Sequence, residues 1–368
     1  MAIKVMVAMS GGVDSSVAAA LLKDEGFEVI GATLKLFSNE EIGLEHQART
    51  CCSLEDVEDA RAVAMRLGFV HHVFNFGELF RQQVINRFAA SYANGETPNP
   101  CIDCNRFIKF DKLLERALVL DMDYIATGHY ARVEFSEERG RYLLKKAADP
   151  SKDQSYVLYA LTQEQLKHTL FPLGNLKKSE VRAIAESRGL VNAKKPDSQD
   201  ICFVKDGDYC SFLENTMKVS SPHGNFVDSK GNVLGEHEGL IHYTIGQRKG
   251  LKLSFEKPKY VIRKDLGSNT VVLGDESELY SEGMLVKDVN LISVEELSAP
   301  MKASVKTRYS QKEAPAVLIP LEDGSLLVRF FEPQRAVTSG QAAVFYDDDT
   351  VIGGGTIVHT PSQREDLL

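Results

Sequence analysis

Strand-like and helix-like hydrophobic patterns alternate along the first half of the chain. Residues 3–10 (IKVMVAMS) form a continuous apolar run typical of a buried strand, and residues 13–26 carry apolar side chains at helical spacing up to Gly26. The pattern then predicts further strands over 27–37, 70–76 and 123–133 and further helices over 53–68 and 77–95. Strands and helices in strict alternation predict a parallel sheet with helices on both faces.

The pattern changes after about residue 205. Residues 224–239 predict a hairpin that turns at SKGN, and short strands separated by Gly, Asp and Pro follow from residue 281 onwards. Many short strands with frequent turn residues favour a small β-barrel. The sequence therefore predicts an α/β domain over residues 1–205, a small central domain over 206–280 and a C-terminal β-barrel over 281–368.

Composition narrows the class of protein. No apolar run is long enough to span a bilayer, and the N-terminus enters a strand pattern at once, so we expect a cytoplasmic protein with no membrane partner. The formal net charge of −9 gives no general support for a nucleic-acid partner, although local Lys and Arg can still bind phosphates. Six cysteines in 368 residues do not form a secreted disulfide scaffold. Spaced cysteines in such a chain indicate metal binding or catalysis.

The segment after the first strand has the composition of a phosphate-binding loop. It reads SGGVDSS from Ser10 to Ser16, and Gly11 and Gly12 allow backbone angles at which successive amides point toward one anion. It lacks the ending of a Walker A loop and the spacing of a dinucleotide-binding loop. The structural alternative is a plain helix start capped by Asp14 or Ser15. The complete segment after an N-terminal strand favours phosphate binding.

SGGVDSS resembles the PP-loop of the ATP pyrophosphatases, which adenylate a carbonyl oxygen and release pyrophosphate. Within that superfamily the chain resembles the tRNA-specific 2-thiouridylases from one end to the other. The segments that carry the resemblance, in order, are 97–110 (TPNPCIDCNRFIKF), 127–132, 149–159, 195–204 (KPDSQDICFV), 242–251, 305–310 and 338–346. The resemblance implies a PP-loop domain, a small central domain and a barrel. It also implies an enzyme, an ATP-dependent sulfurtransferase that replaces the C2 oxygen of a tRNA wobble uridine with sulfur.

The resemblance also implies binding residues and partners. ATP is expected at Ala8, Met9, Ser10, Gly11, Gly12, Val13, Asp14, Ser15, Leu34 and Gly128, with Asp14 acting through Mg²⁺. The residues expected to contact tRNA are Asn99, Pro100, Cys101, His129, Asp153, Gln154, Ser155, Arg308, Tyr309 and Gln341. The basic stretches 143–146, 176–182, 193–195 and 246–252 are candidates for an electropositive RNA track, although each alone is typical of a solvated face. The implied partners are tRNAs with Lys, Glu and Gln acceptors and a cysteine desulfurase or sulfur carrier.

Some of these residues have plainer interpretations. Residues 153–155 alone are typical of a surface turn, and Gly128 alone is typical of a turn glycine.

Two cysteines carry the sulfur chemistry in the resemblance. Sulfur arrives as a persulfide on Cys202, and Cys104 is the nucleophile that resolves it, since only the thiolate form attacks. The chain departs from the commoner family pattern Asn-Pro-Asp-x-x-Cys-Asn, because Cys101 stands where that pattern has the Asp thought to be the general base. A thiol is a poorer base, and nearby Asp103 need not point the same way. The general base therefore stays unassigned.

Cys101 leaves three interpretations open. The first is a persulfide relay in which Cys101 is an accessory thiol. In the second, Cys101, Cys104 and Cys202 are possible ligands of a [4Fe–4S] cluster. The third is a zinc site whose fourth ligand would be Cys51, Cys52 or a histidine. By themselves, Cys51 and Cys52 are typical of small residues before a helix, and Cys210 is typical of a core residue.

Two other functions are consistent with a PP-loop. One is a ligase that adenylates a small-molecule carbonyl, and the other is an RNA-binding protein without catalysis. A ligase would not need the two family cysteines or the barrel residues, and the intact PP-loop and cysteines disfavour a non-catalytic binder.

Overall fold

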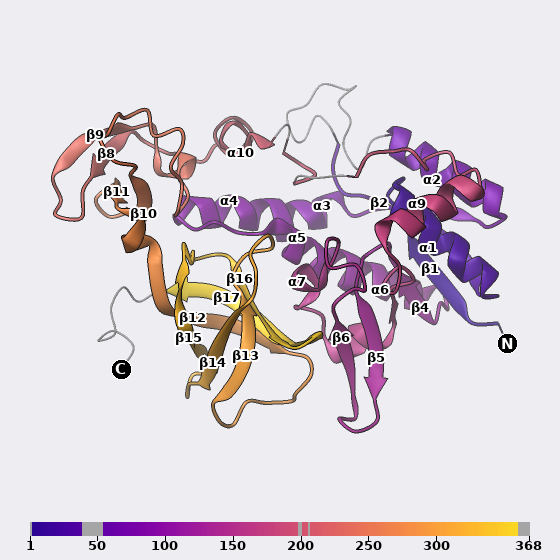
Figure 1. Cartoon of the computed structure of the whole chain (residues 1–368). Coiled ribbons are helices and arrows are strands. Elements are labelled where there is room, and N and C mark those ends of the chain that lie inside the picture. The colour runs from indigo at the N-terminus through magenta and orange to yellow at the C-terminus, as the bar shows by residue number, and fades with distance from the viewer. Residues whose placement is uncertain (1, 39–53, 198–200, 205–206, 360–368) are drawn as a thin grey trace.

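The computed structural model describes residues 2–38, 54–197, 201–204 and 207–359 and contains three sheets (Figure 1). The first is a five-stranded parallel sheet in the N-terminal half. Its strands, in spatial order, are β3 (His71–Asn75), β2 (Glu28–Lys35), β1 (Lys4–Ala8), β4 (Tyr124–Ala126) and β7 (Thr169–Leu170). All four neighbouring pairs are parallel. The predicted α/β class is confirmed.

Helices cover both faces of this sheet because its central strand buries side chains in alternating directions. Val5 and Val7 pack into one apolar cluster with helices α1 (Val13–Asp24), α2 (Leu54–Leu67) and α9 (Lys178–Ser187). Met6 packs into a second cluster on the opposite face. The helices that contribute to this second cluster are α5 (Pro100–Asp103), η3 (Cys104–Lys112), α6 (Leu113–Val119), α7 (Ser155–Leu158) and α8 (Gln163–Lys167).

Two long helical rods lie beside the sheet. The predicted helix over 77–95 is confirmed as α3 (Gly77–Phe80), the π-helical turn η2 (Arg81–Ile85) and α4 (Asn86–Ala93) in direct succession. The second rod joins α5, η3 and α6 without a break from residue 100 to residue 119. Gly26, predicted to end the first helix, follows α1 with φ +87°, a conformation that favours glycine.

The predicted C-terminal barrel is confirmed. Strands β12, β15, β14, β13, β16 and β17 follow one another, and pairing between β12 and β17 closes the ring. Their bounds are β12 (Tyr280–Leu291), β13 (Met301–Lys306), β14 (Ala314–Pro320), β15 (Leu326–Arg335), β16 (Ala342–Asp347) and β17 (Thr350–His359). Strand closure leaves few unpaired edges.

The predicted strand over 123–133 is confirmed only at its start, where residues 124–126 form β4 of the parallel sheet. The chain leaves the parallel sheet after β4 and enters a hairpin of β5 (Arg132–Ser136) and β6 (Arg141–Lys145). This hairpin joins the barrel sheet through β17, where Thr350 pairs with Lys145. The break falls at residues 127–131, which include Gly128, the residue that by itself is typical of a turn glycine.

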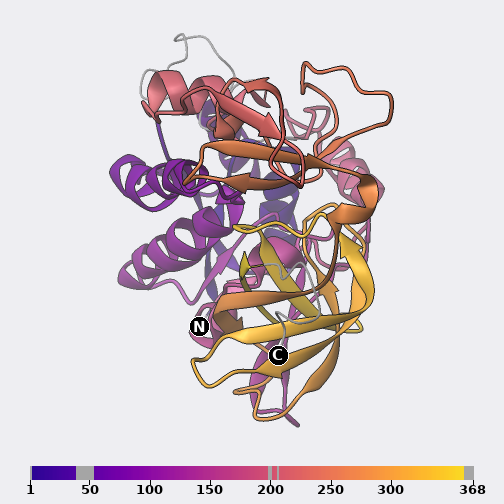
Figure 2. The same ribbon diagram turned by 90° about the vertical axis from the view of Figure 1, so that its left-hand side faces the viewer.

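The central part holds a four-stranded sheet in the order β10-β11-β8-β9. The predicted hairpin is confirmed as β8 (Gly224–Val227) and β9 (Val233–His237), and β10 (Tyr260–Asp265) and β11 (Thr270–Gly274) complete the sheet. The short helices of this part are α10 (Tyr209–Ser211), η5 (Phe212–Thr216), η6 (Leu240–His242) and η7 (Glu276–Leu279). Figure 2 shows this sheet above the barrel, with the purple helical rods along one side of both.

Candidate functional site

The loop between β1 and α1 is held against the second helix at Gly11. Gly11 has φ +71°, and a β-carbon there would lie 2.3 Å from the backbone oxygen of Asp56. The hydroxyls of Ser15 and Ser16 donate to Gly12 O at 3.2 and 3.0 Å. These contacts define the path of the loop into α1, so that the first-turn amides lie where an anion is favoured.

The residues that the resemblance assigns to ATP lie along one edge of the parallel sheet, because β1, β2 and β4 all end there. Gly128 follows β4 and touches the loop, since a β-carbon on it would lie 2.6 Å from Ser15 N. Gly128 therefore permits close approach of the loop itself. The set at this edge is Ala8, Met9, Ser10, Gly11, Gly12, Val13, Asp14, Ser15, Leu34 and Gly128.

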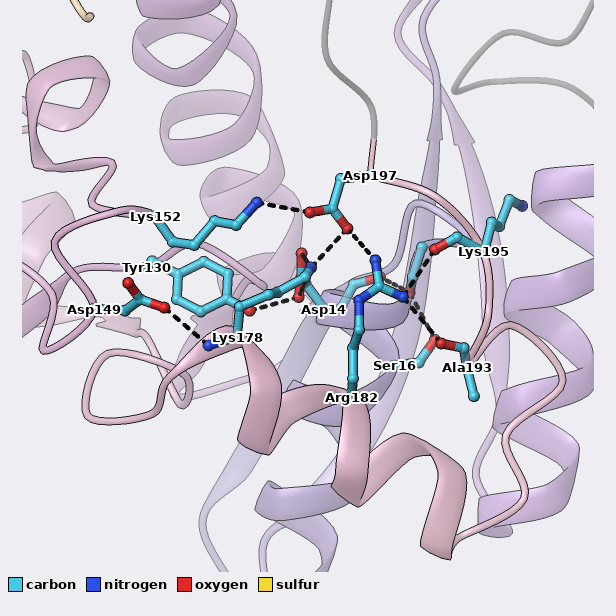
Figure 3. Close-up of polar contacts among 12 residues, drawn as sticks. Asp14, Ser16, Tyr130, Asp149, Lys152, Lys178, Arg182, Ala193, Lys195 and Asp197 are labelled. Carbon is cyan, nitrogen blue, oxygen red and sulfur yellow. Dashed lines mark hydrogen bonds and ion pairs between the residues drawn. The ribbon is translucent and has the colours of Figure 1, made fainter.

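A lysine that the sequence analysis did not assign to this site faces Asp14 (Figure 3). Lys178 Nζ lies 2.7 Å from both carboxylate oxygens of Asp14 and 2.8 Å from an oxygen of Asp197. Only 12% of the Lys178 side chain is exposed. Tyr130 donates its hydroxyl to the Asp14 carboxylate at 2.7 Å. The loop carboxylate is thus balanced by a buried cation, beside amides that favour an anion.

Asp197 connects this lysine to two further cations. Its carboxylate oxygens lie 2.8 Å from Lys152 Nζ and 2.8 Å from an Arg182 nitrogen (Figure 3). Burial alone would raise the pKa of Asp197, but hydrogen bonds from Lys152 and Lys178 outweigh it and lower the pKa to about 2. The carboxylate therefore stays ionised at neutral pH and holds its segment beside the phosphate loop.

Two of the basic stretches proposed for an RNA track are partly turned inward. Lys178 and Arg182 are four residues apart on one face of α9, and both bind Asp197. Lys195 pairs with two carboxylates of α2 at 2.6 Å each. The helical spacing of Lys178 and Arg182 is a signal in the sequence that both face the same neighbour, but it does not identify that neighbour.

Cys101 and Cys104 lie at the start of the second helical rod. Pro100 occupies the first helical position, and Asn99 caps the helix by accepting a hydrogen bond from Cys101 N at 3.1 Å. The Cys104 side chain is buried, whereas Cys101 is exposed. Protein atoms around Cys101 nevertheless desolvate its thiol and raise its pKa, against the opposing charge of Lys109. A thiol whose pKa is raised stays protonated at neutral pH, so it cannot accept a proton as a general base would.

Cys104 and Cys202 contribute to the same apolar cluster. Cys104 belongs to its buried part together with Phe203, and Cys202 packs against it in a half-buried position. Leu34, assigned to ATP by the resemblance, also packs against this cluster. The structure therefore brings the two cysteines that the resemblance assigns to sulfur transfer and the end of β2 to one region of the molecule.

The metal interpretations find no support in this geometry. Within the described part of the chain, no group of three or more His, Cys, Asp or Glu side chains is arranged to hold a metal ion. Cys101, Cys104 and Cys202 are therefore not grouped in this structure as the ligands of an iron–sulfur cluster or of a zinc site would be. Cys51 and Cys52, the candidate fourth zinc ligands, lie outside the described residues.

His129, expected to contact the flipped uridine, is a buried neutral residue. Its Nδ1 lies 2.6 Å from Thr127 Oγ1, and its ring packs against the rings of Phe110 and Phe171. Burial holds the pKa of His129 well below its ordinary value, and the nearby charge of Lys109 acts in the same direction. The imidazole is therefore uncharged at neutral pH.

The segment Asp153–Ser155 forms a turn in the structure. Asp153 accepts hydrogen bonds from the backbone and hydroxyl of Ser155, and Gln154 Oε1 accepts from Tyr130 N at 3.0 Å. Ser155 is fully buried. These side chains fix the chain beside Tyr130, which itself binds the phosphate-loop carboxylate.

Arg308 joins the barrel to the central part. Its Nη2 lies 3.1 Å from Ile245 O, 3.2 Å from Ala336 O and 2.6 Å from Thr338 Oγ1. Burial lowers the pKa of the guanidinium. These three acceptors give Arg308 an internal role that the sequence did not suggest.

Gln341 and Tyr309 join the barrel to the N-terminal part. Gln341 Nε2 donates to Thr97 O at 2.5 Å, and Tyr309 donates its hydroxyl to Asp153 O at 3.2 Å. Thr97 lies just before the helix that carries Cys101. The barrel therefore contacts the segment that leads into α5, at the start of the helical rod that carries Cys101 and Cys104.

We expect Arg308→Met to destabilise the protein by about 2 kcal/mol, because it removes charged hydrogen bonds to buried acceptors. Lys249 provides the matched control, because it is also predicted to contact the RNA but its side chain is exposed. Lys249→Met should leave stability unchanged and weaken tRNA binding. Denaturant unfolding and tRNA titration measure both effects. If Arg308→Met were as stable as the wild type, the internal role of Arg308 would be contradicted.

Comparison with known proteins identifies the family. A model described as the tRNA methyl transferase HUP domain matches residues 3–206, a PRC-barrel domain model matches 210–275, and a model described as the aminomethyltransferase beta-barrel domain matches 281–357. A tRNA-specific 2-thiouridylase from Acetivibrio thermocellus is 56% identical over 355 residues, which cover 96% of this chain and 99% of that protein. The chain belongs to the tRNA-specific 2-thiouridylase family.

A second curated relative agrees with this placement. A tRNA-specific 2-thiouridylase from Clostridioides difficile is 50% identical over 354 residues, covering 96% of this chain and 98% of its own. A solved U34-tRNA thiolase from Methanococcus maripaludis with its [4Fe-4S] cluster aligns with 59% of this chain and 65% of its own at 18% identity, with a TM-score of 0.35. This distant alignment says nothing of the chemistry in the 2-thiouridylase chain. Among the residues of the present protein that the structure describes, no helix is both long and apolar enough to cross a bilayer.

Proposed function

We propose that this protein is an ATP-dependent enzyme that replaces the C2 oxygen of a tRNA wobble uridine with sulfur. One observation carries the proposal: in a chain of the 2-thiouridylase family, Cys104 and Cys202 lie in one apolar cluster that extends toward the phosphate loop. The apolar cluster that contains both cysteines reaches Leu34 at the sheet edge where the loop also lies. Adenylation and sulfur transfer both need their reagents at the same C2 atom, so this convergence fits the reaction.

The first step is adenylation of the base. The uridine C2 oxygen attacks the α-phosphorus of ATP, the bond between the α- and β-phosphates breaks, and pyrophosphate leaves. The amides around Gly11 and Gly12 and the charge of Lys178 stabilise the phosphates. Mg²⁺ fits beside Asp14, since it prefers carboxylate and phosphate oxygens, and when bound it would neutralise phosphate charge.

The second step transfers sulfur from a persulfide on Cys202. In one route Cys104 attacks the Cys202 sulfur, forming a disulfide and releasing sulfide, which attacks C2 and displaces AMP. In the other, the terminal persulfide sulfur attacks C2 and AMP leaves, after which Cys104 attacks the Cys202 sulfur and frees the thiolated base. Both routes leave a Cys104–Cys202 disulfide, which a thiol reductant must reduce. Cys101 serves as an accessory thiol.

The three parts of the chain divide this work in our proposal. Residues 1–205 bind ATP and carry the cysteines, residues 206–280 connect, and residues 281–368 support the tRNA. The residues proposed to meet the RNA are Asn99, Pro100, Cys101, His129, Asp153, Gln154, Ser155, Arg308, Tyr309 and Gln341. The substrates are tRNAs with Lys, Glu and Gln acceptors, and the sulfur donor is a cysteine desulfurase or a sulfur carrier.

The test is mass spectrometry of unmodified tRNA after incubation with the protein, ATP, Mg²⁺ and a donor that delivers sulfur as a persulfide. We expect the wobble uridine to gain the mass difference between sulfur and oxygen, with tRNA-dependent release of pyrophosphate. Pyrophosphate release without tRNA would indicate a small-molecule ligase. The absence of any pyrophosphate release would indicate an RNA-binding protein without catalysis.

We also expect thiolation to survive the removal of iron and zinc, because no three ligating side chains are grouped around a metal site among the described residues. The protein is purified without oxygen, treated with an iron and zinc chelator, separated from it and assayed with Mg²⁺ restored. Iron, zinc and sulfide are quantified in parallel. Loss of thiolation that ferrous iron and sulfide restore would establish a cluster and overturn the persulfide relay.

A further inference from the structure

Asn192 contacts the phosphate loop from a distant part of the sequence. Its Nδ2 donates to Gly11 O at 2.9 Å and to Ser16 Oγ at 2.8 Å, and the residue is 3% exposed. A side-chain amide nitrogen carries two hydrogens, so both are used. The amide orientation is determined by these contacts, since the reverse orientation would place Oδ1 against the Gly11 carbonyl oxygen.

The bond to Gly11 O determines the direction of the next amide. In a trans peptide, the carbonyl of one residue and the N–H of the next point in opposite directions, and the Gly11–Gly12 peptide is trans. With Gly11 O turned toward Asn192, the Gly12 N–H points away from it. None of the hydrogen bonds found among the described residues uses this N–H. An anion-binding loop requires an amide available in this way.

The bond to Ser16 controls the other side of Gly12. Ser16 Oγ accepts from Asn192 and donates to Gly12 O at 3.0 Å. Asn192 thus acts on the peptide before Gly12 directly and on the peptide after it through Ser16. Glycine has the greatest backbone freedom of any residue, so two adjacent glycines gain most from such a constraint.

The backbone of the segment that carries Asn192 is itself held by hydrogen bonds. Lys195 N donates to Asn192 O at 3.0 Å, and Arg182 donates to the neighbouring Ala193 O at 3.2 Å (Figure 3). Arg182 in turn pairs with Asp197. The amide therefore approaches the loop from a segment whose backbone is already ordered, as a positioning residue requires.

We propose that Asn192 is a positioning residue for the nucleotide phosphates. It orients the peptide groups around Gly12 so that they bind phosphate, and it does not touch the phosphate itself. This inference rests on the proposed function, because it requires ATP to bind at the loop.

The test is Asn192→Asp, which keeps the side-chain size but replaces both donors with an acceptor that faces Gly11 O. We expect the Kd of the full chain for MgATP, measured without tRNA, to rise at least about tenfold, and the KM for ATP to rise with it. The affinity for inorganic pyrophosphate should fall in parallel, whereas the affinity for tRNA should change less than about twofold. Ser16→Ala, which removes only the relay to Gly12, should weaken both phosphate ligands by a smaller factor.

Asn290→Asp is the matched control. Asn290 Nδ2 also donates to two acceptors, Tyr159 O and Leu161 O at 2.7 and 3.0 Å, but it joins the barrel to the N-terminal part. We expect this variant to lose stability while keeping wild-type affinity for MgATP and pyrophosphate. A comparable loss of ATP affinity in Asn290→Asp would show that any lost amide contact weakens binding, and would overturn the specific role of Asn192.

The possible failures are distinguishable. If wild-type protein binds neither MgATP nor pyrophosphate, the proposed function itself fails. If the wild type binds both and Asn192→Asp and Ser16→Ala bind them equally well, the inference alone fails. Should Asn192→Asp not fold, Ser16→Ala decides the question by itself.

Discussion

Replacement of Cys202 by serine is expected to lower the yield of thiolated tRNA by at least about 1,000-fold, because a hydroxyl cannot carry the persulfide. Adenylation does not use this sulfur, so tRNA-dependent pyrophosphate release should persist in a single turnover. Sulfur is supplied to both variants as a persulfide, and Cys104→Ser should show the same separation. Mass spectrometry of the tRNA and a pyrophosphate assay measure the two steps independently.

Cys210 provides the control for this experiment. It lies eight positions from Cys202 in the sequence, is half-buried, and its pKa is raised to about 11, mainly by burial and then by the charges of Asp208 and Glu214. Such a thiol is mostly protonated at neutral pH and a poor nucleophile. Cys210→Ser should therefore keep thiolation within about twofold of the wild type. Full thiolation by Cys202→Ser would exclude the proposed persulfide route.

Asp14→Asn is expected to lower the rate of tRNA-dependent pyrophosphate release by about 100-fold or more. The change keeps the side-chain size but removes the charge that pairs with Lys178 and that we assign to Mg²⁺. Asp14 is not among the residues proposed to meet the RNA, so tRNA affinity should stay near that of the wild type. Initial rates over a range of Mg²⁺ and ATP concentrations provide the measurement.

Asp24→Asn is the matched control, at the opposite end of the same helix. Asp24 pairs with Arg188 at the surface, and such exposed pairs contribute at most about 1 kcal/mol to stability. The rate of pyrophosphate release should be unchanged in this variant. An Asp14→Asn enzyme as fast as Asp24→Asn would mean that the phosphates bind without this carboxylate, and the assignment of Mg²⁺ to it would be wrong.

Local patterns in the sequence predicted most of the fold. The apolar run of β1, the helical spacing of α1 and the turn residues of the β8–β9 hairpin each act through neighbours close in the chain, so their signals are legible without tertiary information. The prediction failed at 123–133, where the chain changes sheets between β4 and β5. The hydrophobic pattern of a strand does not state which sheet receives it.

The candidate site divides in the same way. The PP-loop and the spacing of Cys101 and Cys104 are contiguous motifs whose chemistry follows from residue type. Lys178 and Asn192 carry no such motif, because they meet the loop from well over 150 positions further along the chain. Their roles depend on how α9 and the following segment pack against α1, and a single sequence does not contain that information in readable form.

The sequence by itself determined the class of fold and the family, because these depend on short-range periodicity and on motifs that lie within continuous segments. Only the tertiary structure decided which cations face Asp14 and that Arg308 is bound to internal acceptors. Charge and hydrogen-bonding capacity are properties of a residue, but their partners are set by the packing of segments that lie far apart along the chain.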